Sequence, residues 1–170
     1  MEARFVERLA AARIGRTHNQ YADSPLRRAR LAAYLAERTH APILLVAEAP
    51  GYRGTRISGI PLTSERQLTG HGPAEATATV VHRVLDELQL ADDVLLWNLV
   101  PTHPRTSSSN RPPTRAEIDD SARFLAELAR GRRVLPVGRL AHARLGGRYV
   151  RHLSHGGASD FRAGLRGALA

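Results

Sequence analysis

The sequence of 170 residues contains no cysteine and no lysine. Without cysteine, the chain cannot form a disulfide, a thiolate metal site or a cysteine-ligated iron–sulfur cluster. Without lysine, it cannot attack a substrate through a lysine Schiff base. Long apolar runs are also lacking: none approaches the roughly 18 residues of a membrane span, and residues 1–16 carry acidic side chains, unlike a signal peptide. We therefore expect a cytoplasmic protein without a membrane partner.

Positive charge is carried by arginine alone, and the formal net charge is +9. Arginine binds phosphate in a bidentate geometry, so this excess favours a nucleic-acid partner. A GC-rich genome that replaces lysine with arginine would produce the same composition. Charge alone leaves both interpretations open.

Apolar segments alternate with amphipathic segments along the chain. The segments that read as strands are residues 42–47, 93–100, 133–138 and 148–157. Helices are expected at residues 1–13, 24–38, 74–90, 114–131, 139–147 and 158–170, with one helical turn at 64–68 inside a long loop. Strands that alternate with helices predict a parallel sheet covered on both faces. The expected fold is α/β, a three-layer α/β/α domain with a four-stranded parallel sheet, and residues 1–170 form a single domain.

Polar side chains follow three of the four predicted strands. Glu48 directly follows the first strand. Asn98 lies near the end of the second strand, His103 comes just after it, and His152 lies in the fourth. The third strand ends in Pro-Val-Gly, with nothing reactive. Taken singly, such residues are commonly a helix cap, a turn residue or a structural histidine. Because ligands of parallel sheets bind beyond the carboxyl ends of the strands, we expect these side chains to share one site.

Three segments of the chain resemble motifs of the uracil-DNA glycosylase superfamily. They are VAEAPGYRG with GIPL, LLWNLVPTHP with SNRPPT, and RHLSHGG with FRAGL, in the superfamily's order. The first resembles the water-activating motif and gives Glu48 a catalytic role. The third resembles the His-Pro-Ser motif and gives His152 the other catalytic role. The resemblance implies that Asn98 reads the base.

The chain departs from these motifs at several positions. Ala49 stands where the best-known branch has a catalytic Asp, so the acidic role falls to Glu48. Leu153 replaces the Pro of His-Pro-Ser, and Leu62 replaces a Phe that stacks on the base in several branches. The base-binding residues that the resemblance implies are Ala47, Ala49, Gly51, Leu62 and Asn98.

The resemblance implies a monofunctional DNA glycosylase. Such an enzyme hydrolyses the N-glycosidic bond of a flipped uracil or modified pyrimidine and leaves an abasic site. We expect no metal and no cofactor, and a monomer whose partner is single- or double-stranded DNA. The residues expected to contact DNA are Arg111, Ser154, His155 and Gly156.

Two alternatives stay open at this stage. The best-known branch carries a Tyr that blocks the pyrimidine 5 position, and Gly51 stands in its place. A roomier pocket would admit a bulky 5-modified cytosine of phage DNA, which would make the protein an antiviral defence enzyme. The other alternative is a DNA-binding module without turnover, in which Ala49 and Leu153 mark an eroded site.

Overall fold

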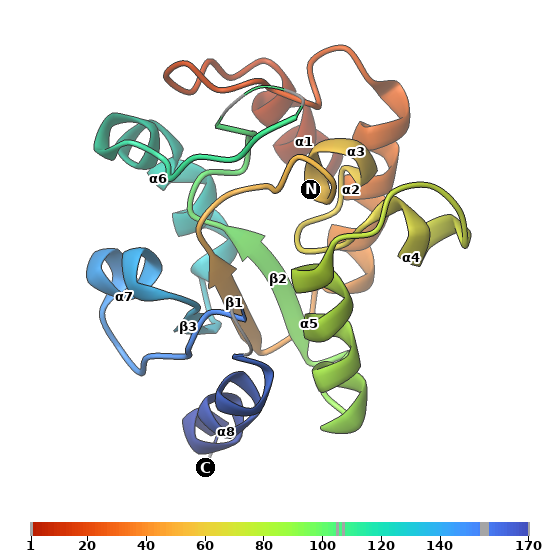
Figure 1. Cartoon of the computed structure of the whole chain (residues 1–170). Coiled ribbons are helices and arrows are strands. Elements are labelled where there is room, and N and C mark those ends of the chain that lie inside the picture. Colours follow the sequence, from red (N-terminus) through yellow and green to blue (C-terminus); the bar gives the residue numbers. More distant parts are fainter. Residues whose placement is uncertain (1, 105, 107, 154–156, 170) are drawn as a thin grey trace.

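The structure is a computed structural model that describes residues 2–104, 106, 108–153 and 157–169. A parallel sheet of three strands lies at its centre, with helices in front of it and behind it (Figure 1). The strands are β1 (Ile43–Ala47), β2 (Val94–Asn98) and β3 (Arg133–Pro136), in the order β2-β1-β3. Every residue of β1 and β2 is buried, as expected for strands covered on both faces. The predicted α/β architecture with a parallel sheet is confirmed.

The helices cover both faces of this sheet. On one face, Phe5 contacts Trp97 of β2 and Phe124 edge to face, with ring centroids 5.7 and 5.6 Å apart. On the other face, two helices lie in front of the strands (α5 and α8 in Figure 1). The helices are α1 (Glu2–Ala10), α2 (Pro25–Glu37), α3 (Thr55–Ser58), α4 (Glu65–Thr69), α5 (Ala76–Glu87), α6 (Arg115–Ala129), α7 (Arg139–Leu145) and α8 (Ala158–Leu169).

Two helix starts follow the local signals in the sequence. Ser24 caps α2 and accepts a hydrogen bond from the backbone N–H of Arg27. Thr114 and Glu117 form the capping box that their spacing predicts at the start of α6. The loop at 55–73 holds two short helices where one turn was expected. The additional helix, α3, has only four residues between Gly54 and Gly59, too few to give a periodic pattern.

The predicted fourth strand is wrong for the described residues. Residues 148–153 contain a single parallel bridge, from Val150 to Val137. Val150 donates its N–H to Pro136 and accepts a hydrogen bond from Gly138. Gly138 has a φ of 89° and turns the chain directly into α7, so the free edge of β3 ends there. The sheet therefore has three strands, and one bridge stands where the fourth was expected.

Among the described residues, no helix is both long enough and apolar enough to cross a membrane.

Candidate active site at the carboxyl ends of the strands

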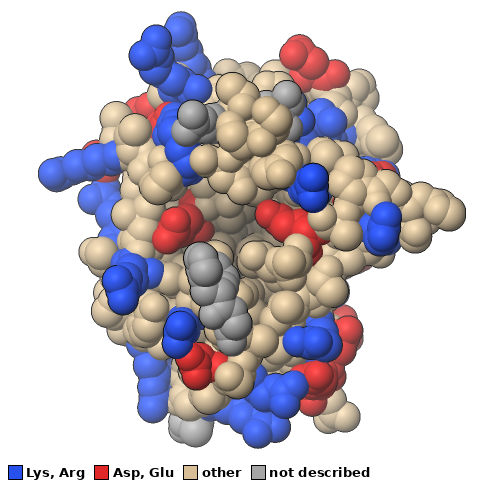
Figure 2. Space-filling view, in the orientation of Figure 1, with Lys and Arg blue, Asp and Glu red and all other residues tan. Residues whose placement is uncertain are grey.

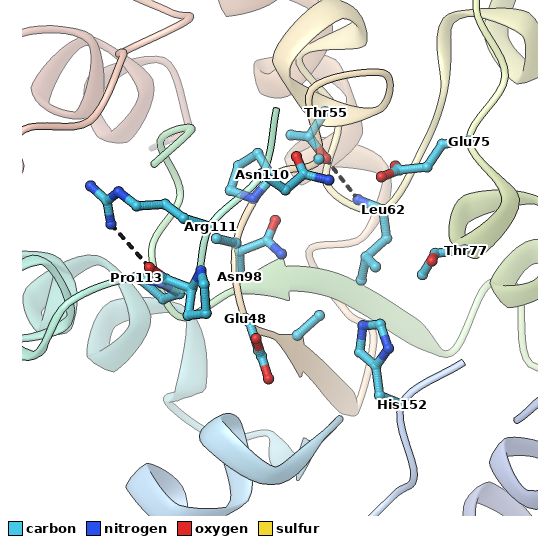
Figure 3. Close-up of a pocket in the computed structure, with 15 residues that line it drawn as sticks. Glu48, Thr55, Leu62, Glu75, Thr77, Asn98, Asn110, Arg111, Pro113 and His152 are labelled. Carbon is cyan, nitrogen blue, oxygen red and sulfur yellow. Dashed lines mark hydrogen bonds between the residues drawn. The ribbon is translucent and has the colours of Figure 1, made fainter. Parts of the chain in front are cut away.

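A pocket of about 310 Å³ opens at the carboxyl ends of β1 and β2 (Figure 3). It brings together all of the predicted catalytic and base-binding residues, and also Arg111. Ser154, His155 and Gly156 lie outside the described residues. The residues that line the pocket are Ala47, Glu48, Ala49, Pro50, Gly51, Thr55, Leu62, Glu75, Thr77, Asn98, Asn110, Arg111, Pro112, Pro113 and His152. Within the described part of the chain, no three His, Asp or Glu side chains gather as a metal site.

Glu48 and His152 are placed against the same glycine. A Cβ atom on Gly138 would lie 3.4 Å from Oε1 of Glu48 and 3.4 Å from Cβ of His152. Gly138 also has a backbone conformation (φ 89°, ψ 166°) that glycine alone adopts readily. Sequence reasoning found nothing reactive after the third strand, because Gly138 contributes a backbone conformation and no reactive group. The turn at Gly138 therefore lies beside both the carboxylate and the imidazole.

Asn98 ends β2 and lies opposite Ala47 in the register of the sheet. Its side chain is among those that line the pocket, and the residue is only 2% exposed. Its Oδ1 atom is buried and has no hydrogen-bond partner among the described residues. Buried polar atoms in proteins are nearly always paired, so an unpaired amide oxygen that lines a pocket indicates a ligand with a hydrogen-bond donor.

Glu75 is the most informative pocket residue that the sequence did not reveal. It is the N-cap of α5, but its side chain makes no capping hydrogen bond. Instead the carboxylate lies against residues 51–54, which we call the glycine turn. A Cβ on Gly51 would lie 1.8 Å from Oε1, and a Cβ on Gly54 would lie 1.8 Å from Oε2. Burial raises the pKa of this carboxyl. An acidic residue just before a helix is usually a cap of that helix, so Glu75 could not be recognised from the sequence as a pocket residue. The space that Gly51 was expected to leave open is taken by Glu75.

Hydrogen bonds from neighbouring loops hold the glycine turn in place. The ring nitrogens of His103 lie 2.8 Å from the carbonyl oxygens of Pro50 and Thr106. Asn110 accepts a hydrogen bond from the backbone N–H of Tyr52 at 3.0 Å. His103 is fully buried and is not among the pocket-lining residues, so its role is to fix the turn. Asn110 was missed although it lies in the SNRPPT segment, since a loop asparagine carries no positional signal of its own.

Leu62 lines the pocket with a φ of 51°, which is unusual for a residue with a side chain. Its backbone N–H donates a 3.0 Å hydrogen bond to the hydroxyl of Thr55, which stabilises this conformation (Figure 3). Strained backbone of this kind is often found at functional sites. The leucine side chain therefore has a defined position on the pocket wall.

Arg111 is held by a buried carboxylate at the edge of the pocket. Its guanidinium donates to both carboxylate oxygens of Glu117, at 2.7 Å to Oε2, and to the carbonyl of Pro112. This pairing holds the pKa of Glu117 at about 2, well below its usual value, and Glu117 is 2% exposed. The pair fixes the loop before α6, and a phosphate at Arg111 would have to share the guanidinium with Glu117.

The charges of the site differ from those of the surrounding surface. Figure 2 shows a hollow with acidic side chains beside it and arginine side chains spread over the rest of this face. Two of the pocket-lining residues, Glu48 and Glu75, carry carboxylates. The pocket therefore favours groups that donate hydrogen bonds or carry positive charge, whereas the arginines favour phosphates around it.

Comparison with known proteins identifies the family and the fold of the chain. The model of the "Uracil DNA glycosylase superfamily" matches residues 35–164. The structure is similar to the crystal structure of wild-type SMUG2 from Pedobacter heparinus, with a TM-score of 0.68 and 13% sequence identity over 99% of this chain and 95% of that chain. No curated protein matches the sequence. At 13% sequence identity, the similarity to this structure shows a shared fold only. The family model covers most of the chain, including both strand ends and His152, and the chain belongs to the uracil DNA glycosylase superfamily.

Proposed function

We propose that the protein is a monofunctional DNA glycosylase that removes a flipped uracil or modified pyrimidine and leaves an abasic site. The observation that carries this proposal is the unpaired Oδ1 of Asn98, buried in a pocket that also contains Glu48 and His152. The N3–H of uracil, or the amino group of cytosine after a rotation of the amide, would supply the missing donor. An extrahelical base is small enough to enter a pocket of about 310 Å³.

Bond cleavage places positive charge on the sugar and negative charge on the departing base. His152 donates a hydrogen bond to the pyrimidine O2 as the negative charge develops. Glu48 stabilises the sugar cation or orients the attacking water. The arginines around the pocket bind phosphates and offset the few kcal/mol that base flipping costs. Arg111, together with Ser154, His155 and Gly156, is proposed to contact the DNA backbone next to the flipped nucleotide.

Uracil is the first substrate to test, because it gives the superfamily its name. The alternative substrate is a 5-modified cytosine, which Gly51 suggested at the level of the sequence, although Glu75 lies in the space beside that glycine. The third possibility is a DNA-binding module without turnover. DNAs that each carry one candidate base are incubated with the protein, and the released base is identified by mass spectrometry. Release of a base with formation of an abasic site supports the glycosylase. DNA binding without release from any DNA supports the binding module.

Variants of the two catalytic residues test the roles proposed for them. We expect Glu48→Gln or His152→Ala to lower the excision rate by roughly 10²–10⁴-fold, because both groups act in the transition state. DNA affinity, measured by gel shift, should change little. Near-native excision by both variants would contradict the assignment of the site.

A further inference from the structure

The pocket has a second carboxylate for which the proposed reaction gives no role. Glu75 comes from the start of α5, on a different element from Glu48. One of its carboxylate oxygens lies beside Gly51 and the other beside Gly54. A Cβ atom on either glycine would lie 1.8 Å from one of these oxygens, so a side chain there would push the end of Glu75 aside. The two glycines therefore make room for this carboxylate on the pocket wall.

Within the described residues, no group donates a hydrogen bond to this carboxylate. As N-cap of α5, Glu75 could accept from the free N–H groups of the first turn, yet its side chain makes no such bond. No other hydrogen bond or ion pair involves its carboxylate oxygens in the part of the chain that the structure describes. Glu75 is half-buried, so its carboxylate faces the pocket without a protein donor, and a ligand with a donor would pair it when it displaces water from the pocket.

Asn98 gives an independent indication of the same ligand chemistry. It lies on β2, is 2% exposed, and has an unpaired acceptor, Oδ1. Two acceptors from separate elements thus line one pocket, and neither is satisfied by the described protein. A base with a single donor, such as uracil with its N3–H, can satisfy Asn98 but has none left for Glu75. A base with a second donor can satisfy both.

We propose that Glu75 is a specificity-determining residue that accepts a hydrogen bond from an exocyclic amino or hydroxyl group of the flipped base. This inference rests on the proposed glycosylase function and names its substrate class: a pyrimidine that carries such a donor in addition to the edge read by Asn98. A base that presents a carbonyl oxygen to Glu75 instead displaces water from the pocket and leaves two acceptors facing each other. Unpaired buried groups of this kind are what allow a polar site to reject an analogue.

Glu75→Gln tests this because it keeps the shape of the side chain and exchanges one acceptor for a donor. The matched control is Glu87→Gln, which removes the same charge from the far end of α5. Both variants and the wild type are assayed on DNAs that carry one uracil, one cytosine or one 5-hydroxymethylcytosine. For the wild type, we expect kcat/KM to be higher on a donor-bearing base than on uracil. This ratio should fall at least about tenfold in Glu75→Gln and stay unchanged in Glu87→Gln. Comparison of the two cytosines distinguishes an amino donor from a hydroxyl donor.

An equal loss on all three DNAs, or an unchanged ratio, would overturn the specificity role while leaving the glycosylase intact. Release of no base by the wild type would instead overturn the proposed function. In that case, binding of free 5-hydroxymethylcytosine and free uracil is measured by calorimetry on the same proteins. If Glu75→Gln binds 5-hydroxymethylcytosine more weakly than the wild type does but binds uracil equally well, the role of Glu75 is supported. Equal effects on the two bases, or binding of neither, refute it.

Discussion

At the scale of single residues, Gly138 forms a strained turn that lies beside both proposed catalytic side chains. We expect Gly138→Ala to lower excision by roughly tenfold, because an alanine would relax the φ of 89° and shift the turn that packs beside Glu48 and His152. The forced backbone conformation should also cost about 1–3 kcal/mol of stability. Excision kinetics and thermal unfolding measure the two effects separately.

Gly146 provides the matched control for this substitution. Its φ of 67° and ψ of −156° impose a similar backbone strain, but a Cβ there would meet nothing within 4 Å. Gly146→Ala should therefore lose comparable stability and keep its excision rate. Equal activity losses in the two variants would show that lost stability alone explains the effect and that the turn at Gly138 does not hold Glu48 and His152 in place.

Glu75 should make the stability of the protein depend on pH. Its pKa is raised in the folded state by burial, so folding favours the protonated form. The stability that this provides is present below the unfolded pKa, near 4.5, and is lost as pH rises through the raised folded value. We expect Glu75→Gln, which cannot ionise, to unfold at a higher temperature than the wild type at pH 7 and at a similar temperature at pH 4. Each kcal/mol corresponds to about 2–4 °C.

The control for this pH series is Glu37→Gln, since Glu37 is an exposed residue at the end of α2. The unfolding temperature of Glu37→Gln should stay close to that of the wild type at every pH. A Glu75→Gln difference that fails to grow with pH would mean that the carboxylate carries no burial cost.

At the scale of elements, the loop before α6 is fastened to the helix by Arg111 and Glu117. Arg111→Ala would leave Glu117 buried without its partner, and we expect a loss of roughly 3 kcal/mol in the free energy of unfolding. Glu117→Gln added to that variant should recover part of the loss, because the orphaned charge is gone. Denaturant unfolding of the wild type, the single variant and the double variant measures this. No recovery in the double variant would contradict the pairing as the cause.

The same variant separates anchoring of the loop from DNA contact. If Arg111 also binds one phosphate, the slope of log affinity against log salt should flatten by about one unit in Arg111→Ala. The slope is measured under conditions in which the variant remains folded. An unchanged slope together with lost stability would assign Arg111 to anchoring alone.

At the scale of the whole molecule, the lack of lysine constrains the chemistry of the product. The reaction should stop at an intact abasic strand, because the Schiff-base route to strand cleavage ordinarily uses a lysine amine. Borohydride added during turnover should trap no covalent adduct between protein and DNA. A trapped adduct would reveal another amine, such as the N-terminus, as the nucleophile.

Much of the arrangement was predictable because parallel strands bring their carboxyl ends to one edge. Glu48 and Asn98 could be placed together on that basis, and the strands that carry them are confirmed. Other parts could not be read from the sequence. The apolar pattern around Val150 looks like a strand, but the edge available for pairing depends on where Gly138 turns the chain. The place of Glu75 depends on a long-range contact between α5 and the turn after β1, which no local pattern encodes.

The separate origins of the two carboxylates have a consequence for how such a protein can diversify. Glu48 follows a buried central strand, where a change would disturb the sheet, whereas Glu75 follows an exposed stretch at residues 70–74, before α5. Mutations that alter the approach to α5 can therefore move or replace Glu75 without touching the strand ends. Under the proposed function, recognition of the base could thus change on one part of the scaffold while the residues proposed for cleavage stay unchanged on the other.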